Sequence, residues 1–335
     1  MSEQQTLGAP SLTAVETSRP AGWGRWLVAA CLLLLAVVPT VSFDSYHLFQ
    51  FTMVVVYALA VLGLAILTGF NGQISLGHGA FYAIGAYTTA ILMYNYDVPY
   101  WVTLPIAAVV CALVGFLIGL PALRLGGMYL ALTTFALAVA VPQILKLNAL
   151  QDLTGGVQGL TLDKPDPPFG LALTTDQWLY LFCLGVTVAL YVVGWNLVRG
   201  RVGRAMMAIR DQAVAAEAMG INLSMLKTRT FAVSAMFTGI AGSLGAIVVA
   251  YVAPDSFNFL LSITLFVGLV AGGAASIPGT IVGAVFVEFV PNWAGDLSKA
   301  APGAIYGALL IAMLFLMPAG AGGLLNTVWR RLGRR

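Results

Sequence analysis

The sequence has few charged residues. Only 9% of its 335 residues are Asp, Glu, Lys or Arg, whereas a soluble domain carries about 25%. The apolar share is 60%, and so few polar groups cannot cover the outside of a water-soluble fold. These proportions exclude a disordered chain and a soluble enzyme with one anchor, and the continuous apolar runs exclude a β-barrel, whose strands would alternate. The sequence predicts a polytopic membrane protein with short loops.

Histidine and cysteine are also scarce. His47 and His78 are the only histidines, so a multi-histidine metal site is excluded. The three cysteines lie in long apolar stretches without a CxxC pair, which favours small core or lipid-facing residues: Cys31, Cys111 and Cys183. The sequence has no P-loop, HExxH or GxSxG motif. We therefore predict a protein that is not an enzyme and has no metal, no cofactor and no nucleic-acid partner.

Long apolar runs predict an all-α membrane helical bundle of about ten transmembrane helices, because one span needs about 20 apolar residues. The predicted spans are 26–43, 48–68, 79–95, 101–120, 129–147, 178–198, 230–252, 259–275, 277–293 and 303–318. The transmembrane domain is predicted at 26–320. It is preceded by a disordered cytosolic tail, 1–25, and followed by a basic cytosolic tail, 321–335.

Basic residues predict the orientation of these spans. If both termini are cytoplasmic, 13 of the 16 Lys and Arg fall on the inside, and only Lys146, Lys164 and Lys299 fall outside. The positive-inside rule therefore favours cytoplasmic termini. It places the loop 199–229 in the cytosol and the loop 148–177 on the outer side.

The inner loop 199–229 is basic at both ends, and its centre is dense in Ala, Met, Arg, Gln and Glu. This composition predicts a surface helix over 205–219, with Gly220 as its C-cap. An amphipathic helix resting on lipid head groups is one interpretation. Docking of a soluble partner is the other, because the small side chains of its centre would let another protein approach closely.

A resemblance to a known family begins in this loop. The stretch AIRDQAVAAEAMGIN resembles the cytoplasmic loop of ABC-importer membrane subunits, of general form EAA-x3-G. Ala215, Ala216 and Gly220 occupy its Ala-Ala and Gly positions, and Val214 replaces Glu. Other segments resemble the branched-chain amino-acid importer permeases, M-type subunit, across most of the chain: 69–87, 123–134, 154–160, 203–222, 253–257 and 317–324.

This resemblance implies an assembly of two homologous permeases, two cytosolic ATPases and a periplasmic substrate-binding protein in the bacterial inner membrane. The helix 205–219 would then lie in a cleft of the ATPase. The implied contact residues are Arg210, Asp211, Ala215, Ala216 and Gly220. The outer TGGVQG loop, with Thr154, Gly155 and Gly156, is a candidate contact for the binding protein, or an ordinary flexible turn.

Polar residues interrupt the apolar pattern between Gly69 and Gly79: Asn71, Gln73, Ser75 and His78. They indicate either a tight loop at the cytosolic surface or a partly re-entrant segment near a translocation path. Irregular backbone at membrane depth is tolerated only inside protein or beside a wet cavity. For His78, structural hydrogen bonding is favoured over proton transfer.

Two further residues are candidates for the path. Glu288 is the only acid well within a span, so it should face protein or water. Either a structural hydrogen-bond partner or a substrate or ion site would explain the position of Glu288. Thr134, in the predicted span 129–147, has the same two interpretations. Gly272, Gly273, Gly279 and Gly283 predict close helix packing.

These observations predict a permease subunit of an ATP-driven importer that moves branched-chain amino acids, or a related small polar solute, by alternating access. The alternative is an ion-coupled secondary transporter. That alternative is disfavoured because such proteins often carry several intramembrane ionisable residues, and only one is found here.

Overall fold

The computed structural model describes residues 38–40, 42–122, 128–168, 172–297, 307–308, 311–312 and 320. The chain forms two units, Met1–Ser42 and Phe43–Arg335, and the helices below belong to the second. The predicted tails 1–25 and 321–335 lie outside the described residues. Most of the predicted spans 26–43 and 303–318 lies outside them as well.

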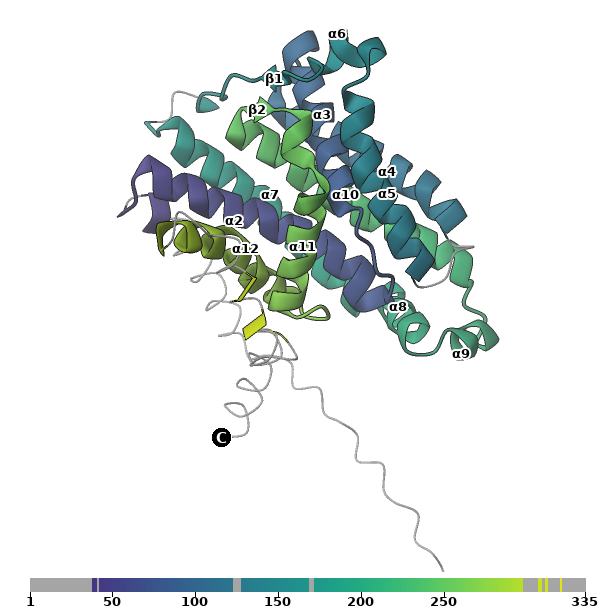
Figure 1. Ribbon diagram of the computed structural model, residues 1–335. Coiled ribbons are helices and arrows are strands. Elements are labelled where there is room, and N and C mark those ends of the chain that lie inside the picture. Colours follow the sequence, from purple (N-terminus) through teal and green to yellow (C-terminus); the bar gives the residue numbers. More distant parts are fainter. Residues whose placement is uncertain are drawn as a thin grey trace, which may run out of the picture. The chain divides into compact units, whose positions relative to one another are not determined.

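The second unit is built from helices (Figure 1). The long helices are α2 (Ser45–Leu64), α3 (His78–Tyr96), α4 (Tyr100–Ala122), α5 (Met128–Leu145), α7 (Thr175–Arg199), α10 (Leu223–Val249), α11 (Phe259–Gly272) and α12 (Ile277–Leu297). A π-helical turn, η1 (Ala65–Phe70), continues α2. Each of the eight predicted spans between 48 and 293 overlaps one of these helices.

Six helices of the described part are long and apolar enough to cross a membrane, and a bent pair formed by α5 and 148–154 adds a seventh candidate. The chain is therefore an all-α, multi-pass membrane protein. The apolar runs identified these helices because a lipid-spanning helix satisfies all its backbone hydrogen bonds internally and needs only length and apolarity.

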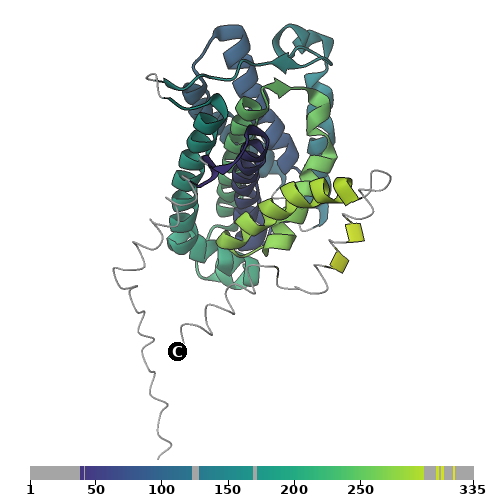
Figure 2. The same cartoon turned by 90° about the vertical axis from the view of Figure 1, so that its left-hand side faces the viewer.

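The core of the bundle is formed by α2, α3 and α10. α2 lies between α7 and α12 (Figure 2), and most of its side chains are buried. α3 and α10 pack at Gly85 and Gly239, where a side chain on Gly85 would collide with the backbone of Gly239. The predicted close packing is confirmed between α11 and α12, where Gly272 faces Gly279 and Gly283 faces Gly268.

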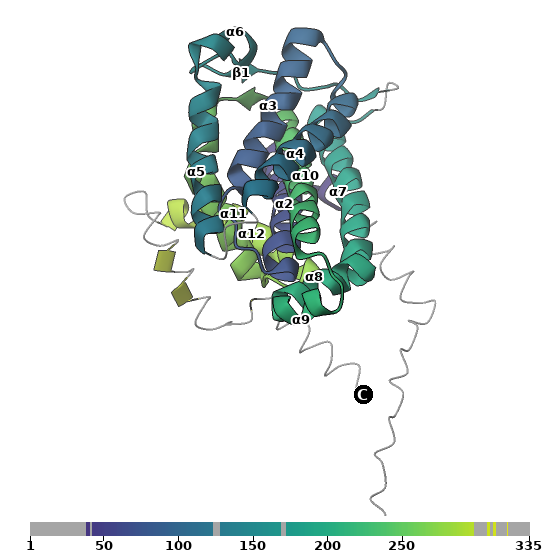
Figure 3. The same cartoon turned by 90° about the vertical axis from the view of Figure 1, so that its right-hand side faces the viewer.

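The two long loops lie at opposite ends of the bundle (Figure 3). One end carries α8 (Arg201–Asp211) and α9 (Ala213–Ala218). The other carries two short helices, η2 (Asn148–Leu150) and α6 (Gln151–Thr154), and strand β1 (Leu160–Thr161). β1 pairs antiparallel with β2 (Tyr251–Val252), and η4 (Pro254–Phe257) follows β2. The end of the segment 148–162 is therefore held by pairing with β2, which directly follows α10.

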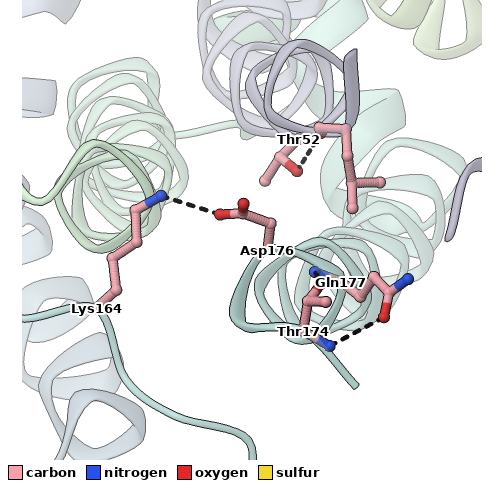
Figure 4. A network of polar contacts seen from close by, with 6 residues as sticks. Thr52, Lys164, Thr174, Asp176 and Gln177 are labelled. Carbon is pink, nitrogen blue, oxygen red and sulfur yellow. Dashed lines mark hydrogen bonds and ion pairs between the residues drawn. The ribbon is translucent and has the colours of Figure 1, made fainter. Parts of the chain in front are cut away.

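Two further contacts involve the start of α7. Thr174 and Gln177 form a reciprocal capping box, in which each side chain accepts a hydrogen bond from the backbone N–H of the other residue (Figure 4). Lys164 forms an ion pair of 3.0 Å with Asp176 in the first turn of α7. An acid at that position also favours the helix macrodipole.

Two predicted boundaries were wrong. The single helix predicted over 205–219 is two helices, because Gln212 adopts an extended conformation (φ −155°, ψ 91°) that ends α8 and starts α9. The span predicted from residue 230 begins earlier, at Leu223, because the Asn222 side chain caps the Met225 N–H. The inner loop is therefore shorter than 199–229, and Lys227 and Arg229 belong to α10.

Candidate functional site

The segment 71–77 joins η1 to α3, and its residues 72–77 form non-helical backbone whose polar side chains are buried. At its far end, His78 contacts Ser234 of α10. Since α10 begins at Leu223, about 16 Å of helix at 1.5 Å per residue separates this contact from the α8–α9 end. At its near end, the Gln73 side chain donates to the Lys227 carbonyl, close to the start of α10. The segment therefore runs back into the bundle, which we call the interior loop (71–77).

His78 links this loop to the core through a chain of hydrogen bonds. The Ser234 hydroxyl donates to the Gly63 carbonyl of α2 at 2.6 Å, so its oxygen accepts from His78 Nε2–H, also at 2.6 Å. His78 Nδ1 then accepts from the Ser75 hydroxyl at 3.1 Å. All four groups are buried, and both ring nitrogens are used. This geometry gives His78 a structural role in joining α2, α3 and α10.

Two more contacts hold the loop and the start of α3. The Thr134 hydroxyl of α5 accepts from the Leu76 N–H at 3.0 Å and donates to Ala131 in its own helix. Ser262 of α11 accepts from the Gly79 N–H at 2.9 Å. Thr134 is thus next to the interior loop, as a shared site would require. Its hydroxyl, like that of Ser75, is already bonded within the protein.

Asn71 differs from the other polar residues of this segment. Its side chain is 2% exposed, yet neither amide atom has a hydrogen-bond partner among the described residues. Leaving a buried polar group unpaired costs about 1–3 kcal/mol. Asn71 is therefore a candidate path residue of the loop whose buried side chain keeps all its hydrogen-bonding capacity free among the described residues.

Arg210, predicted at a partner interface, is bonded inside the chain. It is the last basic residue of α8, and its Nη1 donates to the Gly69 carbonyl of η1 at 2.9 Å. Its Nε donates to Asp211 at 2.9 Å, which orients the guanidinium. Gly72, with φ +72°, packs directly on the Arg210 stem, and a β-carbon there would lie 2.8 Å from Arg210 Cγ. The surface helix and the interior loop are thus in direct contact.

α9 presents small and apolar side chains at its surface. Val214 and Met219 are 78% and 83% exposed, and Ala215 lies exposed beside Val214. Ala216 instead faces inward and is buried. Gly220 is exposed, and with φ +83° it closes α9 by a Schellman motif, in which Gly220 donates to Glu217 and Ile221 to Ala216. The predicted C-cap is confirmed.

Glu288 and the outer loop lie elsewhere. Glu288 is half-buried on α12, and Asn292 one turn later donates to its carbonyl at 2.8 Å. No hydrogen bond or ion pair joins Glu288 to the interior loop in the described part of the chain. Thr154 is buried, and its hydroxyl donates to the carbonyls of α5 and η2. Gly155 and Gly156 have positive φ and shape the turn, whose exposed tip is residues 157–158.

Sequence reasoning missed Ser234 and Ser262, which carry the two hydroxyls that fix the start of α3. Each is a small polar residue within an apolar run, a position that also suits a hydroxyl bonded to its own helix. The only sequence signal was that both runs lie near glycine-rich segments.

Comparison with known proteins identifies the family. Residues 47–318 match the family of the branched-chain amino acid transport system permease component. The chain is 33% identical to the high-affinity branched-chain amino acid transport system permease protein LivM of Salmonella typhimurium, over 80% of this chain and 68% of that protein. The chain belongs to this permease family.

Other permeases of the family are also similar. LivM of Escherichia coli is 32% identical, over 88% of this chain and 74% of that protein. LivH of Escherichia coli, the homologous permease, is 26% identical, over 80% of this chain and 91% of that protein. The higher identity to LivM agrees with the M-type resemblance. No solved structure matches the chain.

Proposed function

We propose that this permease is one of two homologous membrane subunits of an ATP-driven importer in the bacterial inner membrane. It translocates branched-chain amino acids, or a related small polar solute, by alternating access. The relatives are named as permeases of branched-chain amino acid transport systems, and the chain itself has no P-loop. The energy must then come from separate chains, which we infer to be two cytosolic ATPases.

The exposed face of α9 supports this proposal most directly. Val214, Ala215 and Met219 form an apolar, small-residue surface beyond the end of the bundle, next to basic α8. An exposed apolar surface of this kind is typical of a protein contact. We assign Ala215 to the ATPase contact, with Gly220 and Asp211 beside it. Ala216 and Arg210 support the contact from within the chain, because one is buried and the other is bonded to η1.

The opposite end would receive the substrate-binding protein. The ordered segment 148–162 lies there, and its tip at 157–158 is the exposed part of the TGGVQG turn. Thr154, Gly155 and Gly156 would shape this contact, because Thr154 is buried and both glycines have positive φ. The interior loop between the two ends, with Asn71, Gln73, Ser75, His78 and Thr134, is the proposed path region, and Glu288 on α12 is a further candidate.

Co-purification tests the α9 contact. The permease is expressed with the ATPase and second permease encoded beside it, and Ala215→Arg is compared with Asp163→Arg, a charge change on an exposed residue of the opposite loop. We expect Ala215→Arg to abolish recovery of the ATPase while the permease still inserts, and Asp163→Arg to leave recovery unchanged. Retention of the ATPase by Ala215→Arg and by Val214→Arg would refute the docking role.

A further inference from the structure

We propose that Arg210 is a positioning residue through which α8 and α9 move the interior loop, with η1 as the joint between them. The inference rests on the proposed function, because it says where motion of the ATPase contact arrives inside the permease. It reassigns Arg210 from a residue that touches the partner to one that acts on η1.

Arg210 is placed where α8 and the interior loop meet. Its guanidinium donates a hydrogen bond to the Gly69 carbonyl, and its aliphatic stem packs on Gly72. Arg210 therefore contacts the last turn of η1 and the start of the interior loop. Gly69 has no room on its other side, where a side chain would collide with the Ala274 carbonyl between α11 and α12. A movement of Arg210 that keeps its hydrogen bond to Gly69 therefore shifts the Gly69–Gly72 backbone relative to Ala274.

Arg210 is also placed to receive movement from α9. It lies two residues before Gln212, the extended residue that separates α8 from α9. Asp211 fixes the guanidinium through Nε and leaves Nη1 for Gly69. α8 itself is held by its buried face, which includes Met206 and Ile209. A change in the angle of α9 can therefore reach the interior loop through the end of α8, at Arg210.

Three features mark η1 and the following residues as a joint. A π-helical turn is rare and occurs often at functional sites. Gly72 has a left-handed conformation, which lets the chain reverse directly after the turn. Asn71 is buried, and neither amide atom has a partner in the described part of the chain, so a second arrangement could supply hydrogen bonds that this one lacks. The far end of the loop is held by the hydrogen bond between His78 and Ser234. Displacement of the near end at Gly69 would therefore bend the loop relative to this fixed end.

Cysteine labelling tests this inference. Ile74, at the centre of the loop, is 48% exposed, and Ile74→Cys is introduced into a chain whose three native cysteines are replaced by alanine. Maleimide labelling of the full complex is measured without nucleotide and with ATP and vanadate. We expect a several-fold change in labelling rate, and we expect Arg210→Met to abolish this nucleotide dependence.

A matched set of variants separates a positioning role from a contact role. Arg210→Met, Arg210→Lys and the control Arg204→Met, an exposed arginine of the same helix, are each measured for ATPase recovery, ATP hydrolysis and uptake. For Arg210→Met we expect the ATPase to stay bound and uptake per ATP to fall about tenfold or more. Arg210→Lys should restore much of it, because an ammonium can still donate to Gly69.

Each other outcome overturns the inference. Loss of ATPase recovery in Arg210→Met would make Arg210 a partner contact. If Arg210→Met leaves the uptake per ATP unchanged, or leaves the nucleotide dependence of labelling at Ile74→Cys unchanged, the motion does not pass through Arg210. If labelling at Ile74→Cys in the parent complex does not depend on nucleotide, the interior loop does not move. Failure of the proposed function itself is distinguishable, because the parent complex would then bind no ATPase.

Discussion

Ser234 determines which nitrogen of His78 carries the proton. Its hydroxyl has one hydrogen, which it donates to Gly63, so the imidazole must donate to it from Nε2 and accept from Ser75 at Nδ1. The chain of bonds joins residues 156 positions apart. It fixes the first turn of α3 to the two helices of the core.

Removing this hydroxyl is expected to destabilise the permease. Ser234→Ala leaves the Nε2–H of His78 buried without a partner, at a cost of about 1–3 kcal/mol, which corresponds to a fall in melting temperature of several degrees. Thermal unfolding in detergent measures it. The control is Ser224→Ala, which removes an exposed hydroxyl from the same helix. Equal melting temperatures for the two variants would contradict this role of the Ser234 hydroxyl in the chain of hydrogen bonds.

Only part of this chain of hydrogen bonds could be predicted from the sequence. Asn71, Gln73, Ser75 and His78 interrupt an apolar pattern, and the interruption marks them as buried or functional. Ser234 gives no such signal, because serine within a membrane helix often bonds its own backbone. The partner of His78 follows from the contact between α3 and α10, which no local pattern contains.

In α8 and α9, one helix boundary has a local cause and another has a tertiary cause. The end of α9 could be predicted, because Gly220 has no β-carbon and its backbone adopts φ +83° without steric cost. The break at Gln212 could not, because the surrounding residues all favour a helix. It is explained by tertiary contacts: α8 buries Met206 and Ile209, and Arg210 is held by Gly69, while α9 leaves the bundle.

Gly220 offers a test of this cap. Gly220→Ala places a β-carbon in a left-handed conformation at a cost of about 1–2 kcal/mol, so α9 should fray and the amides of 216–221 should exchange with deuterium several-fold faster. Gly220→Asn is the matched variant, because asparagine tolerates this conformation better. Indistinguishable exchange in the alanine variant and the parent would mean that the Schellman motif does not hold α9.

Close packing of α11 on α12 gives a second test at this scale. Gly279→Val would drive its side chain into the backbone of Gly272, and such overpacking costs about 1–3 kcal/mol. Gly295→Val is the control, because Gly295 on the same helix has open space around it. We expect only the first change to lower the melting temperature in detergent. A similar loss in both variants would attribute the effect to valine itself.

At the scale of the whole molecule, the two ends of the bundle have different chemistry. One end carries the arginines of α8 and the exposed apolar face of α9. The other carries the segment 148–162 with Asp152, followed directly by Asp163. Composition predicted this asymmetry through the distribution of Lys and Arg. The order of 148–162 was not predicted, because β1 pairs with a strand about 90 residues later in the chain.

The source of energy is the property that decides between the two transport mechanisms. A proton-coupled carrier needs ionisable groups at membrane depth. The interior loop and Thr134 instead offer an amide at Asn71 without a partner among the described residues, and hydroxyls already bonded within the protein. The complex of two permeases, two ATPases and binding protein, reconstituted in vesicles with leucine outside, should therefore take up leucine when ATP is present inside. Uptake should persist when ionophores collapse the proton and sodium gradients, and it should stop when the ATPases are omitted. Uptake by the permease alone that follows an imposed ion gradient would instead establish secondary transport, and it would remove the reason for assigning α9 to an ATPase.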